Sequence, residues 1–496
     1  MNINNSNIVL LFKKKIAALF VIILLATFLN LWNNDFPLGY HPDEVKKVRF
    51  ILTNTQDFRH PILMLNIVRL ANLLFGYVVP DHVVLLGRTI MALFGTLLVI
   101  VFYALALRLL TPLYALFATL TLASTPILVV HSHYLKEDIL FSFFSLLSLL
   151  AYFSFLKNTD KLRTLYLGLS VGFALSAQYK TLFLLPIFLI GPFLFRPRNR
   201  PLLYKNIFIA MAVSAVIFMV VNYPIFNNFS IFKKAVYFTS DHIQRGHDLK
   251  IYPLPHFFSF HLLNSIVPGI TPLVTVLSLL FLCYFLVKWK RLKVEERILL
   301  CYLGIFYVAH EITPMKPYPD FMRYMIPVVP VLIYFLYKGL EEIEEHLNQI
   351  IPRLTVYIIL LFIFILPLQS SIRLDYHLNR DTREKAEEWL KGKQGLVLFE
   401  RYSTKNWEAK LSLTDVNLQT YRSLKVKYLV ASSFLYERYE YGAQLSGQSP
   451  DVYPRHNGYR ELFLHPYVEI KPAYKSFAFS NPTIRIIDMA EKLDDL

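Results

Sequence analysis

Two kinds of residue are scarce in this chain: charged residues and cysteines. Only 17% of its 496 residues are Asp, Glu, Lys or Arg, whereas soluble globular domains contain about 25%. The two cysteines, Cys283 and Cys301, both lie in apolar segments, which excludes a disulfide framework and a paired-cysteine metal site. Internal repeats and low-complexity tracts are also missing from the sequence. Since 55% of the residues are hydrophobic, the scarcity of charge predicts a membrane protein with several spans.

The charge that is present is mostly positive, with a formal net charge of +16. In a soluble protein such a balance would indicate nucleic acid, but here Lys and Arg lie largely in short loops between apolar runs. That distribution is typical of membrane topology and of contact with lipid headgroups, so we expect no nucleic-acid partner. Lys13, Lys14 and Lys15 precede the first apolar run, and no small-residue cleavage site follows it. This pattern favours a retained signal anchor.

The apolar segments predict about eleven membrane-spanning helices within residues 1–370, because each segment is near the length needed to cross a bilayer. The loops predicted to lie inside are mostly basic, which places the N-terminus inside by the positive-inside rule. An odd number of spans then places residues 371–496 outside. The expected spans are 16–32, 84–107, 113–130, 139–156, 164–178, 181–195, 207–222, 266–287, 297–312, 324–338 and 354–370.

The outer loops are predicted to contain further helices. Residues 45–52 are apolar at helical spacing, which is typical of a helix lying in the membrane interface. Residues 61–79 are interpreted as a second juxtamembrane helix and not as a span, because Asn66, Arg69 and Asn72 argue against full lipid exposure. The outer loops expected to carry catalytic residues are 33–82, 131–138, 223–262 and 313–323.

Residues 371–496 differ in composition from the rest and predict a small extracytoplasmic α/β domain. Short apolar runs at Leu396–Phe399 and Tyr428–Ser432 are typical of buried strands. Thr382–Leu390 has a helical pattern, with Ala386 and Trp389 on the same face as Leu390. The expected fold is therefore an α-helical multi-pass membrane protein with a small α/β domain at its C-terminal end.

A short acidic stretch, Tyr40 to Glu44, follows the first apolar segment. Ionisable groups beside a membrane segment indicate a functional site. The alternative is an acidic start to a surface helix, since Pro42, Asp43 and Glu44 all suit a first helical turn. Two carboxylates this close disfavour each other's charge, so one pKa is expected to rise unless a nearby cation opposes the rise.

The predicted topology places many polar residues on the outer side of the membrane, at the outer ends of the predicted spans. Carboxylates can act as bases or metal ligands, and Arg and Lys can hold phosphate. Single features have simpler explanations: Arg88 and Lys180 could reach the interface as snorkelling side chains, and Asp138 could cap its helix. Their agreement on one face indicates a site for an anionic, lipid-borne substrate. The residues concerned are Asp43, Glu44, Arg88, the turn His131 to Asp138, Lys180, the histidines of 242–256, Lys316 and Arg323.

The order of these features resembles the lipid-dependent glycosyltransferases of the C-type membrane fold. The protein O-mannosyltransferases and the aminoarabinose transferases of lipid A are the most similar members. The likeness covers most of the chain, and its motifs are informative only in this order. They are Pro42-Asp43-Glu44, His60-Pro61, Gly87-Arg88, the turn His131 to Asp138, Tyr179-Lys180-Thr181, Arg323-Tyr324-Met325-Ile326-Pro327 and Asp381-Thr382-Arg383.

The resemblance implies an inverting glycosyltransferase of the plasma membrane with its site outside. A polyprenyl-phosphate sugar, undecaprenyl or dolichyl, would be the donor, and a hydroxyl of a protein, lipid or glycan would attack its anomeric carbon. Asp43 matches the family's base, Glu44 would position Asp43 or the acceptor, and Asp138 matches a second acidic position. The donor phosphate would be held by Arg88, Lys180 and Arg323, with His60, His131 and His133 in support.

Two other functions and one cofactor stay open at this stage. A transporter or flippase of polyprenyl-linked sugars would place polar groups near the bilayer midplane, often with inverted repeats, and a non-catalytic assembly protein would tolerate loss of Asp43. A divalent metal ion could be ligated by Asp138 with His247 or His256, although no ligand spacing is specific.

Overall fold

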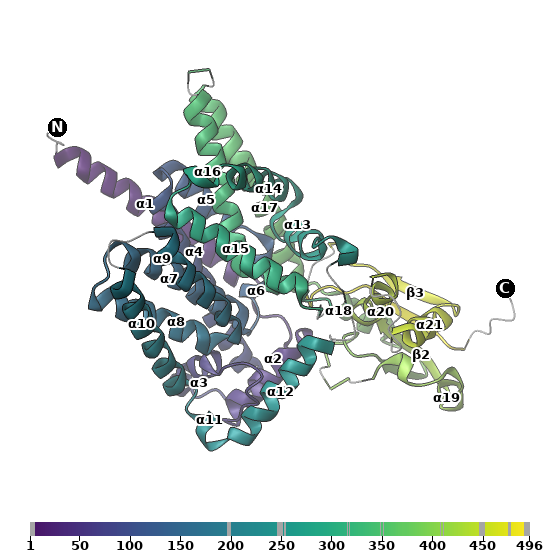
Figure 1. Cartoon of the computed structure of the whole chain (residues 1–496). Helices are drawn as coiled ribbons and strands as arrows, with labels where there is room; N and C mark the ends of the chain where they lie inside the picture. The colour runs from purple at the N-terminus through teal and green to yellow at the C-terminus, as the bar shows by residue number, and fades with distance from the viewer. Residues whose placement is uncertain are drawn as a thin grey trace.

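The computed structural model describes a helical body with a small mixed sheet at its C-terminal end (Figure 1). The described residues are 5–195, 200–245, 251, 254–314, 316, 318–347, 349–350, 352–406, 408–409, 411–445, 452–474 and 478–490. Helices of the first part of the body are α1 (Asn5–Leu31), α2 (Pro42–Leu52), α3 (Leu63–Phe75), α4 (Pro80–Leu109), α5 (Pro112–Ala123), α6 (Pro126–Ser132), α7 (Glu137–Lys157), α8 (Lys161–Ala177), α9 (Leu184–Phe195) and α10 (Arg200–Val221).

The later helices of the body complete the bundle, with α4 packed between α1 and α7, and α10 packed against α8. They are α11 (Pro224–Asn227), α12 (Phe229–Arg245), α13 (Val267–Ile270), α14 (Pro272–Val287), α15 (Val294–Ile312), α16 (Val329–Leu347) and α17 (Arg353–Leu378). A 3-10 segment, η6 (Phe321–Val328), leads into α16. The acidic segment between the predicted spans 324–338 and 354–370 is largely helical, because α16 continues through it to Leu347.

Two of the predicted spans are broken. The segment 113–130 divides into α5 and α6, which are bent by 54°, and the segment 266–287 bends by 113° before α14. Each break precedes a proline, Pro126 in the first case and Pro272 in the second. Proline lacks a backbone N–H and disfavours helical geometry in the residue before it, which explains why an apolar run alone could not predict the breaks.

Within the described residues, four helices are long and apolar enough to cross a membrane, and the two bent pairs raise the number to six. All eleven predicted spans fall on helical segments, but several of these are short, so the number of about eleven stays a prediction. The juxtamembrane segment 61–79 contains α3, whose last residue is followed by Gly76 in a left-handed conformation (φ 66°) that terminates the helix.

The C-terminal domain is a four-stranded sheet with strand order β1-β2-β4-β3. The pair β1–β2 is parallel, whereas β2–β4 and β3–β4 are antiparallel. The predicted strand at 396–399 and helix at 382–390 are confirmed, and the predicted strand at 428–432 begins two residues earlier. The elements are α18 (Thr382–Leu390), β1 (Leu396–Phe399), α19 (Leu418–Ser423), β2 (Val426–Ser432), α20 (Ser433–Leu445), α21 (Val452–Leu462), β3 (Tyr467–Ile470) and β4 (Ile484–Asp488).

Alternation along β2 divides the domain into layers. Tyr428 and Val430 pack against Ala386 of α18, whereas Leu429 and Ala431 belong to the core that includes α20 and α21. Successive strand residues face opposite sides of a sheet, so an uninterrupted apolar run means that both faces are covered. The membrane body meets this domain through α17, which continues past residue 370 to Leu378 before α18 begins.

Candidate active site

The stretch Tyr40 to Glu44 enters α2 through a cap that fixes where its two carboxylates point. The imidazole Nδ1 of His41 accepts a hydrogen bond from the backbone N–H of Asp43, at 3.2 Å. Pro42 occupies the first helical position, where its missing N–H has no cost. Consecutive residues of an α-helix project about 100° apart. Asp43 and Glu44 therefore face different neighbours, although they adjoin in the sequence.

Glu44 forms a closed ion pair with Arg88, and both side chains are buried. The guanidinium contacts both carboxylate oxygens, Nε to Oε1 at 2.9 Å and Nη2 to Oε2 at 2.5 Å. Its other hydrogens are directed at the carbonyls of Asn34 (3.2 Å), Phe36 (2.5 Å) and Pro37 (3.5 Å). Arginine has five N–H donors, and here all of them are engaged. The predicted contact of Arg88 with a donor phosphate does not fit this arrangement.

The predicted role of Glu44 in positioning an acceptor does not fit either, because its carboxylate is shielded from solvent. Its Oε1 accepts a further hydrogen bond from the backbone N–H of Leu135, at 2.8 Å. Glu44 thus ties α2 to the turn between α6 and α7, and it acts on Asp43 only by fixing the helix that carries it.

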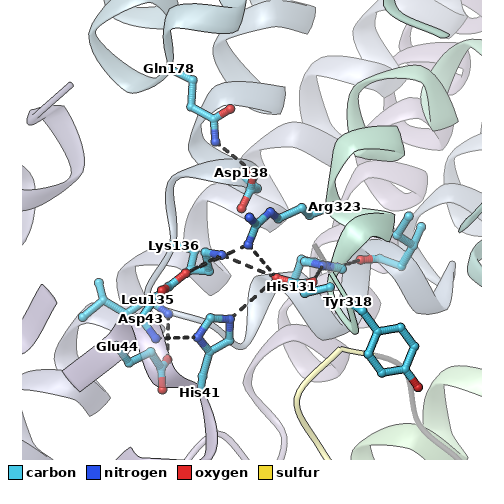
Figure 2. A network of polar contacts seen from close by, with 12 residues as sticks. His41, Asp43, Glu44, His131, Leu135, Lys136, Asp138, Gln178, Tyr318 and Arg323 are labelled. Atoms are coloured by element: carbon cyan, nitrogen blue, oxygen red, sulfur yellow. Dashed lines mark hydrogen bonds and ion pairs between the residues drawn. The ribbon is translucent and has the colours of Figure 1, made fainter. Parts of the chain in front are cut away.

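Asp43 lies in a second, more open cluster, seen from close by in Figure 2. Its side chain is 50% exposed and its Oδ2 lies 3.0 Å from Lys136 Nζ and 4.0 Å from Arg323 Nη1. Lys136 comes from the turn before α7 and Arg323 from η6. A half-exposed carboxylate is thus held beside two cations that come from other parts of the chain.

A buried carboxylate, Asp320, connects the parts of this cluster. Its Oδ1 lies 2.9 Å from His131 Nε2, and its Oδ2 lies 2.9 Å from Arg323 Nη1 and 3.4 Å from Lys136 Nζ. His41 Nε2 lies 3.8 Å from the same Oδ2. Asp320 is therefore the common neighbour of the stretch before α2, of α6, of the following turn and of η6.

The charges of this cluster shift the pKa values of its members. Burial raises the pKa of Asp43, but Lys136, His41 and Arg323 outweigh it and hold that pKa well below its usual range. Burial acts on Asp320 in the same way, and Lys136 and Arg323 again keep its pKa well below the usual value. Burial lowers the pKa of Lys136, yet the neighbouring carboxylates raise it overall. The rise in carboxylate pKa that was expected from the acidic pair is therefore outweighed by the cations, and Asp43 is ionised at neutral pH.

Asp138 lies next to this cluster, in the first turn of α7. Its Oδ1 accepts a hydrogen bond from the side-chain amide of Gln178 at 2.8 Å. Lys180, two residues further, is half-buried, and its Nζ lies 4.0 Å from the centre of the Tyr324 ring. The predicted residues Asp138 and Lys180 are thus brought to the same end of the bundle as Arg323.

The three supporting histidines have different positions. His131 contacts Asp320, as described above. His60 is exposed, and the charges of Lys47 and Asp138 act on its imidazole. The imidazole of His133 is buried, with Nε2 2.9 Å from the carbonyl of Trp32. This histidine packs inside the body, and a supporting role at the carboxylate cluster does not fit its contacts.

The predicted metal ligands do not form a group. Among the described residues, no three His, Cys, Asp or Glu side chains are grouped so that they could hold a metal ion. His247 lies outside the described residues, and neither Asp138 nor His256 belongs to such a group. The side chains that surround Asp138 are an amide and cations, which favour an anion over a cation.

Sequence reasoning missed Asp320 and gave Lys136 no separate role. Both are buried charged residues that lie within three or four positions of residues already chosen, Arg323 and His133. An acidic residue three before an arginine at the outer end of a span was the available signal, since such spacing brings side chains together in a helical turn.

One known family model matches part of the chain. Residues 59–223 match the family model described as dolichyl-phosphate-mannose-protein mannosyltransferase. The matched segment contains Lys136, Asp138 and Lys180, and it covers about a third of the chain. No curated protein matches the chain in sequence.

Solved structures of low sequence identity share the fold. The archaeal oligosaccharyltransferase AglB from Archaeoglobus fulgidus, in complex with an inhibitory peptide and a dolichol-phosphate, is 14% identical with a TM-score of 0.58; the match covers 95% of this chain and 75% of AglB. ArnT from Cupriavidus metallidurans, bound to undecaprenyl phosphate, is 12% identical with a TM-score of 0.53; the match covers 95% of this chain and 98% of ArnT.

These matches confirm the predicted resemblance at the level of family model and fold. The solved structures establish the fold, and the family model, which matches about a third of the chain, agrees with a glycosyltransferase. The chain therefore has the C-type membrane glycosyltransferase fold and is similar to the dolichyl-phosphate-mannose-protein mannosyltransferases and to ArnT.

Proposed function

We propose that the chain is an inverting glycosyltransferase that moves a sugar from a polyprenyl-phosphate donor to an acceptor hydroxyl. The observation that carries the proposal is the half-exposed Asp43 carboxylate beside the cations Lys136 and Arg323. A base and a phosphate-binding pair are thus adjacent, as a displacement at a phosphate-bound sugar requires. Dolichol-phosphate in the AglB complex and undecaprenyl phosphate in the ArnT complex support a lipid-phosphate donor.

Asp43 is proposed as the general base. The acceptor oxygen attacks the anomeric carbon, the bond between that carbon and the phosphate oxygen breaks, and polyprenyl phosphate leaves with the bonding electrons. The hydroxyl proton passes to the Asp43 carboxylate and then to water. Asp43 is the one carboxylate among Asp43, Glu44 and Asp320 with a half-exposed side chain, so it is the one that an acceptor can reach.

Lys136, Arg323 and Lys180 are proposed to hold the leaving phosphate. The phosphate gains negative charge as the glycosidic bond breaks, and cations already in place stabilise that charge without reorganisation. The guanidinium of Arg323 has hydrogens beyond the one directed at Asp320, unlike Arg88. Lys136 replaces Arg88 in the set predicted from the sequence.

Donor binding would also adjust the base. In the unliganded protein the cations hold the pKa of Asp43 well below its usual range, which makes it a weak base. A phosphate bound by Lys136 and Arg323 would compensate their charge, and its own charge would raise the pKa of Asp43. Asp43 thus becomes a stronger base only when the donor is bound, so the acceptor hydroxyl is deprotonated only when a donor is present to react with it.

A divalent metal does not fit the donor set of this cluster. An AglB structure in complex with zinc and sulfate, 14% identical with a TM-score of 0.55 over 94% of this chain and 73% of AglB, shows that a protein of this fold can bind zinc. Here the carboxylates of Asp43 and Asp320 are paired with Lys136 and Arg323, and cations would repel a metal ion. We therefore assign the phosphate to protein cations alone.

The cluster and the C-terminal domain are proposed to lie on the outer face of the plasma membrane. Support comes from the basic loops, which are predicted to lie on the opposite side. A cysteine placed at Lys427 is expected to react with an impermeant thiol reagent in intact cells.

The test of the function is sugar transfer by the purified protein in lipid nanodiscs. Wild type would be incubated with polyprenyl-phosphate sugars that differ in sugar and in chain length, together with membrane extracts as acceptor. Asp43→Asn keeps the size of the side chain and removes the base, so it should fold and still bind the donor lipid phosphate while transfer falls by about 10²–10⁴-fold. Asp57→Asn, on a partly exposed carboxylate that pairs with Lys46 and Arg59, is the matched control. Transfer by Asp43→Asn at the wild-type rate would assign Asp43 to helix capping.

A further inference from the structure

The C-terminal domain contacts the loop that carries Asp320. The hydroxyl of Tyr318 donates a hydrogen bond to Glu437 Oε2 at 2.5 Å, and Arg438 Nη2 donates to the Tyr318 carbonyl at 2.9 Å. Glu437 and Arg438 lie on α20, whereas Tyr318 precedes Asp320 by two residues. The position of this loop therefore depends on a helix of the other domain.

The same domain also contacts the stretch before Asp43. The guanidinium of Arg383 stacks 3.8 Å from the centre of the Tyr40 ring and donates to the Tyr40 carbonyl at 3.4 Å. The ring of Phe479 lies 4.6 Å from the imidazole of His41, the residue that caps α2. Both loops that supply a carboxylate to the cluster are thus held by the C-terminal domain.

Tyr402 joins these two sets of contacts. Its hydroxyl is a hydrogen-bond partner of Arg438, and Asp43 is near enough for its charge to act on Tyr402. The Tyr402 ring packs 5.6 Å from the ring of Phe479. Its backbone has φ of 70°, a left-handed conformation that is unfavourable for a bulky residue and is held only where surrounding contacts compensate.

We propose that Arg438 is a positioning residue for sugar transfer: it joins Tyr318 to Tyr402 and thereby fixes the Asp320–Arg323 loop against Asp43. The inference rests on the proposed function and extends it, because it gives the C-terminal domain a part in the reaction. Arg438 is 5% exposed, so it acts through Tyr318 and does not touch the substrates itself. The side chain has to be arginine, because a planar guanidinium can reach a carbonyl and a hydroxyl from fixed directions whereas lysine is a single point charge.

The expected effect is on the rate and not on binding. Misplacement of a reacting group by about 1 Å can cost about 10²-fold in rate, whereas binding of the lipid phosphate depends on cations that several contacts hold. Arg438→Lys should therefore lower kcat by about 10-fold or more and leave the Kd for undecaprenyl phosphate within about 2-fold. Tyr318→Phe, which removes only the hydroxyl directed at Glu437, should lower kcat less.

The matched control is Arg485→Lys. Arg485 belongs to the same domain, pairs with Glu469 and stacks over aromatic rings of the domain, so its replacement tests domain stability without touching the Tyr318 loop. All variants would be compared as full-length protein in nanodiscs for melting temperature, kcat and Kd. A melting temperature of Arg438→Lys near that of Arg485→Lys, with a lower kcat only in Arg438→Lys, is the expected result.

Hydrogen exchange separates this inference from the proposed function. Peptides covering 318–323 should exchange faster in Arg438→Lys than in wild type and should be unchanged in Arg485→Lys, whether or not a suitable acceptor is known. Unchanged exchange, or a wild-type kcat in Arg438→Lys, would overturn the positioning role. If the peptides exchange faster in Arg438→Lys but the wild-type protein transfers no sugar from any donor, the positioning contact stands and the proposed function is contradicted.

Discussion

Asp43 and Glu44 are neighbours in the sequence and belong to two different electrostatic environments. Glu44 pairs with Arg88 in a fully buried contact in which every guanidinium hydrogen is used. Asp43 is half-exposed and lies at the edge of a cluster whose cations are shared among several carboxylates. The first pair is complete without a ligand, whereas the cations of the second are the ones proposed to hold a phosphate beside Asp43.

The difference shows that the type of residue does not decide its role here. Both acids have an arginine partner, Glu44 with Arg88 and Asp43 with Arg323. Exposure and unused hydrogen-bond donors separate the structural pair from the site. A buried ion pair contributes little net stability when it is complete but leaves a costly charge when one partner is removed, and this asymmetry allows the two regions to be tested apart.

The largest effect is expected for Arg88→Lys. Lysine keeps the positive charge but cannot make the two-point contact with Glu44 and leaves backbone carbonyls without donors, so the folded state should lose about 1–3 kcal/mol for each buried group left unpaired. Thermal unfolding in detergent and the yield of monodisperse protein would measure it. Donor binding per folded molecule should be unchanged. A stable Arg88→Lys protein that fails to bind undecaprenyl phosphate would return Arg88 to the phosphate site.

A smaller effect, and on binding, is expected for Arg323→Lys. The loss of a charge-assisted hydrogen bond costs about 1.5–3 kcal/mol, which corresponds to roughly 10–100-fold in Kd for the lipid phosphate. Isothermal titration with undecaprenyl phosphate would measure it, with Arg59→Lys, on the partly exposed pair with Asp57, as control. Equal Kd values in wild type and Arg323→Lys would remove Arg323 from the phosphate site.

The next prediction concerns pH. Because its pKa is lowered, Asp43 stays ionised even at pH values below the ordinary pKa of an aspartate. The kcat/KM of wild type should therefore not fall as the pH is lowered from 7 to about 5. Lys136→Met removes a cation, so the pKa of Asp43 should rise and the acid limb should move to higher pH. A pH profile of kcat/KM for both proteins measures this shift. An acid limb at the same pH in both would show that Lys136 does not control the base.

The smallest effect is expected from chelation. Since the carboxylates of the cluster are paired with protein cations, prolonged treatment with a chelator should leave transfer within about 2-fold of the untreated enzyme. Elemental analysis of the treated protein is the control for removal. Loss of transfer that zinc or magnesium restores would show that a metal takes part after all.

Local patterns predicted the first helix and strand of the C-terminal domain, and they singled out some members of the candidate site. The helix Thr382–Leu390 and the strand Leu396–Phe399 follow from periodicity and from the cap Asp381. Asp43 and Arg323 were chosen because the predicted topology places all residues of the outer loops on one side of the membrane. The topology does not predict which of these residues contact one another.

The contacts themselves depend on packing between distant segments. Asp320 and His131 are separated by 189 residues, and Glu44 and Arg88 by 44, so no local pattern relates them. The exposed fraction of a side chain is likewise set by the whole bundle, and it is the property that distinguishes Asp43 from Glu44.

The length of α17 has a consequence for how the two domains can be altered. Its 26 residues extend about 39 Å at 1.5 Å per residue, which exceeds the roughly 30 Å of a bilayer core. The last turns of α17 therefore extend beyond the bilayer core and connect the bundle to the C-terminal domain. One residue inserted into those turns would rotate the domain by about 100° and carry Arg438 away from Tyr318. A change in the length of this helix would therefore rotate the whole C-terminal domain relative to the bundle and alter every contact between the two. A change of length in a surface loop of the domain would not have this effect.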